Sequence, residues 1–301
     1  VQTCALPICA SGTFLLTADV DGYTQSAVPS RLAVLGQTSL DNVTVLADDV
    51  TIVGAITSGA STTSVGGVIA SLVVEVPTPT GYTGRTAQVR VAQATSGASG
   101  YQLRAASGGS SGYAYLLAEQ SNASPYAYRA SAAPVPSLST GSTASAALVL
   151  PTLEVSSTLT CDQHGAPCSI TVSGAGWSAN SNDYVGIYAK DAAGIIRSFG
   201  SVPVSNGTLS PQKFVAQEPT WPTGQYTVFA SQGTGASQRY VALSEPFAVS
   251  AGTMASSCPV TDGSATPSGS QVKVTGSVTH ASAGVPNACV KVGLAYGPES
   301  R

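Results

Sequence analysis

The feature that most constrains the fold of this 301-residue chain is a sequence segment that occurs twice, 105 positions apart. Residues 23–50 and 128–155 align without a gap. Solenoid repeats are units of roughly 20 to 50 residues, whereas one β-sandwich domain has about 100. The spacing therefore predicts successive sandwich modules. The matching pairs are Tyr23 and Tyr128, Ser26 and Ser131, Ala27 and Ala132, Pro29 and Pro134, Gly36 and Gly141, Thr38 and Thr143, and Val50 and Val155.

The composition favours β-structure along the whole chain. Only 9% of the residues are charged, against about 25% in ordinary soluble domains. Short runs of Val, Ile, Leu and Thr recur between Gly, Pro, Asn and Ser, which is typical of strands and turns. No stretch carries apolar residues at helical spacing. We expect an all-β fold of tandem β-sandwich modules, transthyretin-like or immunoglobulin-like, with partial modules at both ends.

The charge pattern argues against two classes of partner. The net charge is −3, and the 12 basic residues are scattered singly. A nucleic-acid surface needs clustered Lys and Arg to displace counterions from phosphates, so we expect no nucleic-acid partner. No window approaches 18 uninterrupted apolar residues, so the sequence predicts no membrane span here.

The first eight residues are expected to have a separate origin. Residues 1–8 resemble the translation of a common sequencing adapter, and the sole Met of the chain is Met254. We therefore leave residues 1–8 out of the fold, as for any processing scar. The remaining sequence is expected to be a metagenomic fragment of a longer multidomain protein.

Two families are similar to parts of the chain. Near the end, a β-branched run before Gly276 is followed by a turn and by Val-Pro-x-Ala-x-Val-x-Val, which ends at Val292. This order resembles carboxypeptidase regulatory-like repeats, small transthyretin-like sandwiches found in tandem on secreted and surface proteins of bacteria. Residues 49–155 resemble a full copy with two additions, a strand-like segment at 85–92 and a Gly/Ser-rich loop at 96–112.

Residues 156–250 have a different character. A Gly-x-Gly-aromatic motif ends at Trp177, and a Gly-x-Tyr-x-Val motif contains Tyr226 and Val228. Both motifs resemble those of bacterial immunoglobulin-like domains. Because successive strand residues point to opposite faces, Tyr226 and Val228 are predicted to be buried on one face. Trp177 and Trp221 are expected to fill the core, with sugar stacking as the alternative.

These patterns together predict a division of the chain into modules. In chain order, the segments are the adapter translation (1–8), the closing half of a sandwich repeat (9–48), a complete regulatory-like sandwich (49–155), an immunoglobulin-like sandwich (156–250), a linker (251–270) and the opening part of a further repeat (271–301).

The cysteines indicate an oxidising compartment. Cys161 and Cys168 enclose a turn-rich loop between two strand-like segments, so they are predicted to face each other across a hairpin as a disulfide. A bridge between Cys258 and Cys289 would tie the linker to a strand. Isolated buried thiols are the alternative in both cases. An even number of cysteines in a Ser/Thr-rich β-protein favours an extracellular or cell-surface location.

No catalytic or cofactor site is predicted. Nucleophilic catalysis needs a base beside the nucleophile, but His164 and His280 lie in Gly-, Ala- and Ser-rich turns and no nucleophile elbow is present. Asp48 and Asp49 are weak candidates for calcium, which prefers six to eight oxygen ligands. Their competing interpretation is a turn, where Asp serves backbone geometry.

Three functions remain open at this stage. The leading hypothesis is a non-catalytic structural or adhesive segment of a secreted or surface protein of bacteria, with polysaccharide or other surface and matrix proteins as partners. The alternative is an accessory region of a secreted hydrolase or peptidase whose catalytic domain lies elsewhere. A third is a carbohydrate-binding module, with sugar rings stacked on Tyr113, Tyr115, Tyr126 and Tyr128; cross-strand packing would explain these tyrosines equally well.

Overall fold

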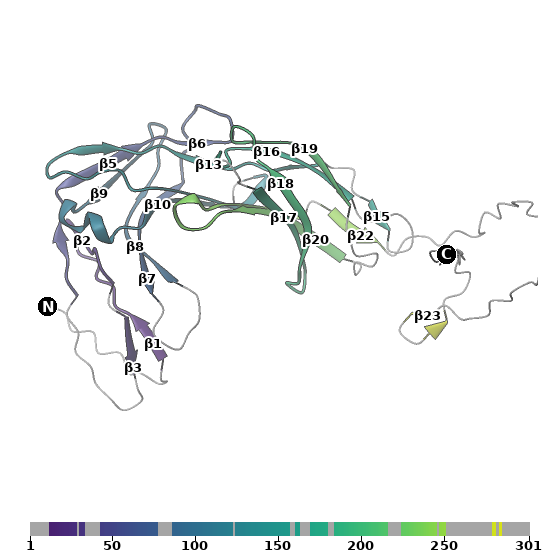
Figure 1. The fold of residues 1–301 in the computed structure, drawn as a ribbon, viewed down its shortest axis with the longest axis horizontal. Coiled ribbons are helices and arrows are strands. Elements are labelled where there is room, and N and C mark those ends of the chain that lie inside the picture. Colours follow the sequence, from purple (N-terminus) through teal and green to yellow (C-terminus); the bar gives the residue numbers. More distant parts are fainter. Residues whose placement is uncertain are drawn as a thin grey trace, which may run out of the picture.

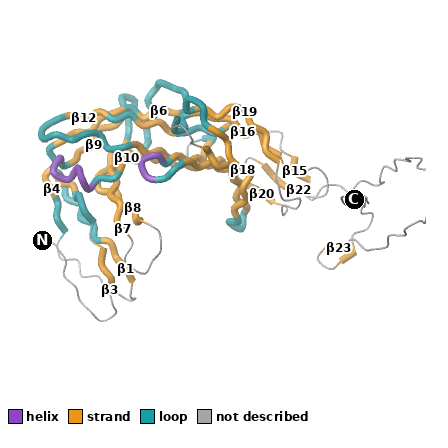
Figure 2. Tube along the Cα trace, viewed as in Figure 1, coloured by secondary structure: helices purple, strands orange, loops and turns teal. Residues whose placement is uncertain are grey.

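A computed structural model describes residues 12–28, 30–33, 43–77, 86–122, 124–156, 160–162, 169–179, 184–215, 224–245, 247–250, 279–280 and 283–284. Strands dominate these residues, and the helical segments are two short 3-10 helices, η1 (Ser107–Gly112) and η2 (Gly235–Ser237) (Figure 2). The predicted all-β sandwich fold is confirmed. No helix among these residues is long and apolar enough to cross a membrane.

The first unit is a two-layered sandwich. One layer contains the antiparallel strands β8, β7, β10 and β11 in that order, and the other contains β12, β5 and β9 with β13 and β6 beside them. The bounds are β5 (Val50–Gly54), β6 (Ile56–Ser58), β7 (Ile69–Pro77), β8 (Thr86–Thr95), β9 (Tyr101–Ala105), β10 (Tyr115–Ser121), β11 (Tyr126–Ala133), β12 (Thr143–Ser145) and β13 (Leu148–Leu150).

The second unit repeats this two-layered plan. One layer contains β14, β16 and β19, and the other contains β18, β17 and β20, with β21, β22 and β15 beyond β20. The bounds are β14 (Glu154–Val155), β15 (Thr160–Asp162), β16 (Ser169–Ala175), β17 (Tyr184–Asp191), β18 (Ile196–Pro203), β19 (Thr208–Val215), β20 (Gly224–Gln232), β21 (Arg239–Leu243) and β22 (Phe247–Ser250).

One sheet runs through both units. Strand β21 pairs with β20 of the second unit along one edge and with β11 of the first unit along the other. The β11 pairing is antiparallel, and its register places Arg129 opposite Val241 and Ser131 opposite Arg239. Figure 1 shows the result as an arch, with β5, β6, β13, β16 and β19 above and β10, β17 and β20 beneath.

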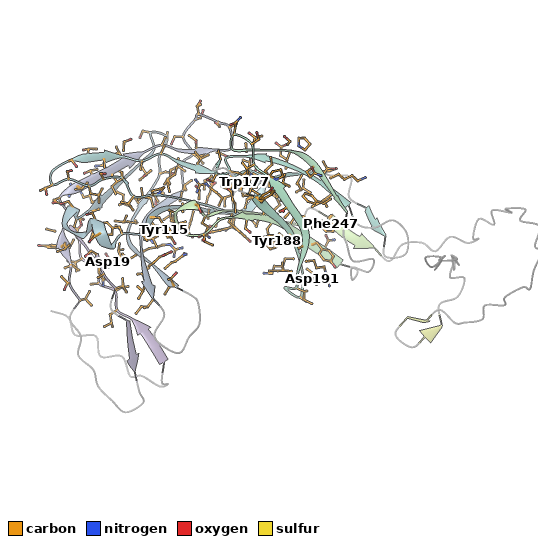
Figure 3. The ribbon with its side chains drawn as sticks, viewed as in Figure 1. Asp19, Tyr115, Trp177, Tyr188, Asp191 and Phe247 are labelled. Carbon is orange, nitrogen blue, oxygen red and sulfur yellow. The ribbon has the colours of Figure 1, made fainter. Side chains whose placement is uncertain are left out.

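Each unit encloses its own apolar core. The first core is mostly aliphatic and includes Ile52, Leu72 and Leu116, all fully buried. The second core contains large rings, and Trp177 lies there, as the sequence predicted (Figure 3). Tyr226 and Val228 are also buried in it, which confirms the predicted alternation. Burial of each such side chain contributes roughly 1.5 to 3 kcal/mol to folding.

Smaller pieces precede and follow the two units. Val28 packs into the first core although it belongs to the preceding predicted module. Short antiparallel pairs form the rest: β1 (Gly12–Leu15) with β3 (Ser30–Ala33), β2 (Tyr23–Thr24) with β4 (Leu46–Ala47), and β23 (Thr279–His280) with β24 (Ala283–Gly284).

Two sequence-based expectations are wrong in detail. The predicted Gly/Ser-rich loop at 96–112 contains β9, which pairs with β5 and alternates buried and exposed residues. Flanking glycines and serines hid this short strand. The predicted hairpin around Cys161 is not formed, because β15 pairs in parallel with β22 while β16 pairs with β14 and β19.

Candidate functional site

Two of the four tyrosines predicted for a sugar-stacking face are buried. Tyr113 is 7% exposed and packs into the first core, while Tyr115 is 1% exposed and packs on the opposite face of the sheet (Figure 3). Neither ring presents a face to a ligand, so the prediction is wrong for both. The two residues differ in face because β10 begins only at Tyr115, and the strand alternation does not extend back to Tyr113.

The other two predicted tyrosines make contacts within the protein. Tyr126 lies under the guanidinium of Arg129, whose central carbon is 4.7 Å from the ring centroid. Tyr128 packs against Tyr240, with 5.5 Å between ring centroids. The Tyr128–Tyr240 contact joins β11 to β21 and is the cross-strand packing that the alternative interpretation predicted. The Tyr126–Arg129 contact lies within β11. Sugar stacking on Tyr126 and Tyr128, which are half-buried, stays a prediction.

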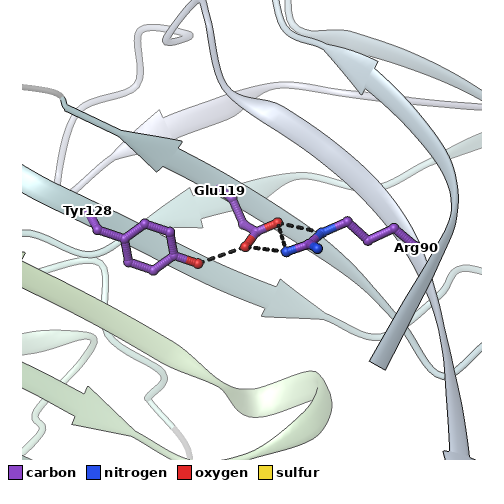
Figure 4. Close-up of polar contacts among 3 residues, drawn as sticks. All are labelled: Arg90, Glu119 and Tyr128. Atoms are coloured by element: carbon purple, nitrogen blue, oxygen red, sulfur yellow. Dashed lines mark hydrogen bonds and ion pairs between the residues drawn. The ribbon is translucent and has the colours of Figure 1, made fainter. Parts of the chain in front are cut away.

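Tyr128 also belongs to a polar triad (Figure 4). Its hydroxyl donates to Oε1 of Glu119 at 2.7 Å. Arg90 binds the same carboxylate through two donors, with Nε 2.8 Å from Oε2 and Nη2 2.7 Å from Oε1. Burial and the hydrogen bond to Glu119 raise the pKa of Tyr128 well above its ordinary value. Paired guanidinium and carboxylate charges of this kind are typical of a structural surface contact.

An aromatic row, defined as Tyr128, Tyr240, Phe229 and Tyr188, crosses the outer face of the shared sheet. Tyr240 lies 5.8 Å from Phe229, and Phe229 lies 5.1 Å from Tyr188, measured between ring centroids. The four rings come from the adjacent strands β11, β21, β20 and β17. The sequence analysis missed this row, although each ring alternates with buried residues such as Val228 and Val241.

The inner face of the same sheet carries two arginines at the junction of the units. Arg129 is only 4% exposed. Its Nη1 donates to Ser58 Oγ at 2.6 Å and its Nη2 donates to Gln120 Oε1. Its Nε is buried and has no hydrogen-bond partner.

Arg239 lies diagonally across the β11–β21 ladder from Arg129. Nη1 makes both of its described hydrogen bonds, to the carbonyl oxygens of Ala132 and of Gln238. Its Nε is buried and has no hydrogen-bond partner among the described residues, and the same is true of the hydroxyl of Ser131, the residue opposite it in the ladder. Desolvation lowers the pKa of Arg239, and that of Arg129 chiefly for the same reason.

A cleft of about 370 Å³ opens beside Arg239, and we name it the inter-unit cleft. It lies between the first unit, represented by Gly59, Ala60 and Val149, and the second, represented by Trp177, Asn206 and Arg239. No carboxylate is among its described lining residues. A second, more polar groove of about 550 Å³ lies on the other side of the sheet, between Glu75, Gln88 and the loop around η2.

The two candidate calcium ligands take part in hydrogen bonds within the protein. Asp48 accepts from the hydroxyl of Thr24 at 2.5 Å. Asp49 accepts from the backbone nitrogen and the hydroxyl of Ser107, both at 2.6 Å. The Ser107 hydroxyl and then its N–H hold the pKa of Asp49 below its ordinary value. In the described ranges, no group of three or more His, Cys, Asp or Glu side chains converges as a metal site.

Several predicted residues fall outside the described part of the chain. They are His164, Trp221, Cys168, Cys258 and Cys289, and for Cys161 and His280 the backbone alone is described. The two disulfides therefore stay predictions. If the first forms, it connects β15 in one layer of the second unit to the residue directly before β16 in the other layer.

Comparisons with known proteins add little. No family model matches the sequence, and no curated protein matches it. A DUF3823 family protein from Bacteroides ovatus is 12% identical, with a TM-score of 0.23, over 67% of this chain and 100% of that one. Another from Parabacteroides merdae is 8% identical, with a TM-score of 0.19, over 64% and 96%. Likeness at this level carries no argument, so the interpretation of the junction depends on its geometry alone.

Proposed function

We propose that this chain is a non-catalytic structural segment of a secreted or cell-surface multidomain protein of bacteria. In this role, its sandwich units hold neighbouring domains, or an adhesive surface, at a fixed distance and angle. The finer assignment to carboxypeptidase regulatory-like and immunoglobulin-like modules is part of the proposal and is supported by the sequence motifs.

The observation that carries the proposal is the ladder between β11 and β21. Interdomain connections are ordinarily exposed linkers that few contacts cross, so relative motion of the domains is the default. Here five register pairs of a β-ladder cross the junction instead. Two further contacts support the ladder. The N–H of Ala132 donates to the carbonyl of Gln238, and Ala236 packs against the buried cluster that contains Tyr115 and Leu117.

Hydrogen exchange of the whole chain tests the rigid junction. We expect the amides of β11 and β21 to be protected as strongly as those of β10 and β20, because a ladder inside a sheet opens only with the sheet. Exchange of β11 and β21 at the rate of exposed loops, with both cores still protected, would show a hinge and contradict the proposal.

The flanking gene sequence tests the biological setting. A leader peptide with a wall anchor or with further repeats is the expected result for a structural surface segment. A catalytic hydrolase or peptidase domain in the same reading frame would instead make this region an accessory part of an enzyme.

A further inference from the structure

We propose that the inter-unit cleft binds an oxyanion, a carboxylate or a sulfate group, through the guanidinium of Arg239. The proposal does not depend on the structural role, since it holds equally for an accessory region of an enzyme. The first observation is the positive charge at the junction, where Arg129 and Arg239 share the inner face of the sheet. Such diagonal positions lie about 7 to 8 Å apart in an antiparallel ladder.

Neither arginine is paired with a carboxylate among the described residues. Among the described residues, the hydrogen-bond acceptors of Arg129 and Arg239 are all uncharged, a serine hydroxyl, an amide oxygen and two backbone carbonyls. Arg129 is buried and Arg239 is half-buried. Charges that are withdrawn from water are ordinarily paired, because removing an ion from water is costly unless an opposite charge compensates. An anion in the cleft would supply that compensation.

The edge of Arg239 formed by Nε and Nη2 makes no hydrogen bond to a described residue. A guanidinium binds a carboxylate side-on through Nε and Nη2, and Arg90 uses this edge on Glu119. In Arg239 the described hydrogen bonds occupy Nη1 alone, and the buried Nε has no partner. The same donor edge is therefore occupied in one arginine of this sheet and unoccupied in the other.

The surrounding cleft fits a small organic body attached to the anion. Besides Arg239, its wall includes the amide of Asn206, the hydroxyls of Ser178 and Thr208, and the apolar side chain of Val149. Because no described lining residue is acidic, nothing in this wall repels a negative charge. A uronic acid sugar or a sulfate ester matches this combination of one cation, neutral donors and an apolar patch.

Ligand titration with thermal unfolding tests the site on the whole chain. The probes are glucuronate, inorganic sulfate and glucose, with ionic strength held constant by sodium chloride. Glucose is the neutral match of glucuronate. We expect glucuronate or sulfate to raise the melting temperature with saturation, while glucose has no effect. Because sulfate also stabilises proteins by exclusion from their surfaces, each shift is taken relative to that of Arg239→Gln.

Two variant pairs separate the site from general effects. Arg239→Gln should weaken binding about tenfold or more, since a charge-assisted hydrogen bond is lost, whereas Arg104→Gln on the exposed face of β9 should bind as the wild type. Ala60→Glu at the cleft rim adds a repelling carboxylate and should weaken binding similarly, whereas Ala60→Gln should not. Ala60 is exposed, so this second pair remains informative if Arg239→Gln folds poorly.

The outcomes divide cleanly. A saturable response to glucuronate supports a carboxylate ligand, and a saturable response to sulfate alone supports a sulfate ester. Equal responses to glucuronate and glucose would overturn the proposal. So would unchanged binding in Ala60→Glu, or a folded Arg239→Gln protein that binds as tightly as the wild type.

Discussion

The two units share one structural feature, which we name the corner: a glycine, a backbone carbonyl against it and an aromatic hydrogen-bond donor. The residues that form it differ between the units. In each, a glycine of the central strand of the three-stranded sheet, β5 or β16, lies against a backbone carbonyl, and an aromatic side chain donates a hydrogen bond to that carbonyl. In the first unit these are Gly54, the carbonyl of Ala146 and the hydroxyl of Tyr101, 2.8 Å from the oxygen. A Gly that follows a β-branched run within a strand is typical of a bulge or of a close backbone contact.

In the second unit the glycine is Gly174, and Nε1 of Trp177 donates to the carbonyl of Thr152 at 3.1 Å. The difference lies in the source of the carbonyl. Ala146 belongs to the first unit itself, whereas Thr152 belongs to the segment that connects β13 of the first unit to β14 of the second. The corner of the second unit therefore depends on the path of the chain as it leaves the first unit. The corner of the first unit does not depend on the second unit.

The largest expected effect comes from filling the two glycine positions. A Cβ at Gly54 would lie 1.8 Å from the Ala146 oxygen, and one at Gly174 would lie 2.2 Å from the Thr152 oxygen. Both are backbone atoms that cannot rotate away. We expect Gly54→Ala and Gly174→Ala each to lower the free energy of unfolding by about 3 kcal/mol, measured by urea denaturation.

Gly97→Ala is the matched control, because a Cβ there meets no atom within 4 Å. Its effect should stay within about 0.5 kcal/mol. A loss at Gly54 no larger than that at Gly97 would show that the first corner is not as tight as described.

Removing the aromatic donors should have the next largest effect and sharpens the comparison. Tyr101→Phe and Trp177→Phe each leave a carbonyl without this donor, at a cost of about 1 to 3 kcal/mol, with lost volume added for Trp177. Hydrogen exchange should show increased opening in the first unit alone for Tyr101→Phe. For Trp177→Phe, it should also increase in the β13 segment. Equal, local effects in both variants would remove the asymmetry between the corners.

Alkaline pH should act on the first corner and not on the second. Burial raises the pKa of Tyr101 to about 12, whereas the indole of Trp177 does not titrate. Because the folded pKa lies above the ordinary value of 10.0, the stabilisation is complete below that value and is lost as the pH rises towards 12. Melting temperatures from pH 9 to 12 should therefore fall less steeply in Tyr101→Phe than in the wild type. An unchanged slope would argue against a buried hydroxyl.

Acid should have the smallest effect, through Asp49 beside β5. Its pKa lies below the ordinary 3.8, chiefly because of the Ser107 hydroxyl. A lowered pKa contributes stability above the ordinary value that is lost as the pH falls through the lowered one. Asp49→Asn should therefore flatten the fall of the melting temperature below pH 4. Identical profiles for Asp49→Asn and the wild type would contradict the role of Ser107.

The sequence predicted what depends on local pattern. Alternation placed Tyr226 and Val228 correctly in the second core. The junction depends instead on pairing between β11 and β21, more than a hundred positions apart in the chain, whose register no local pattern specifies. The repeat held one signal for the burial of Arg129. Arg129 occupies the position that Thr24 has in the first copy of the repeated segment, and Thr24 is also buried.

The shared sheet also determines how this segment would respond to a sideways pull. Two domains on a peptide tether swing freely, and their separation varies with tether length and composition. These two units cannot swing without breaking the hydrogen bonds between β11 and β21. Their relative direction is therefore set by the twist of the strands. An array of such pairs would grow along a fixed curve and would be rigid rather than flexible.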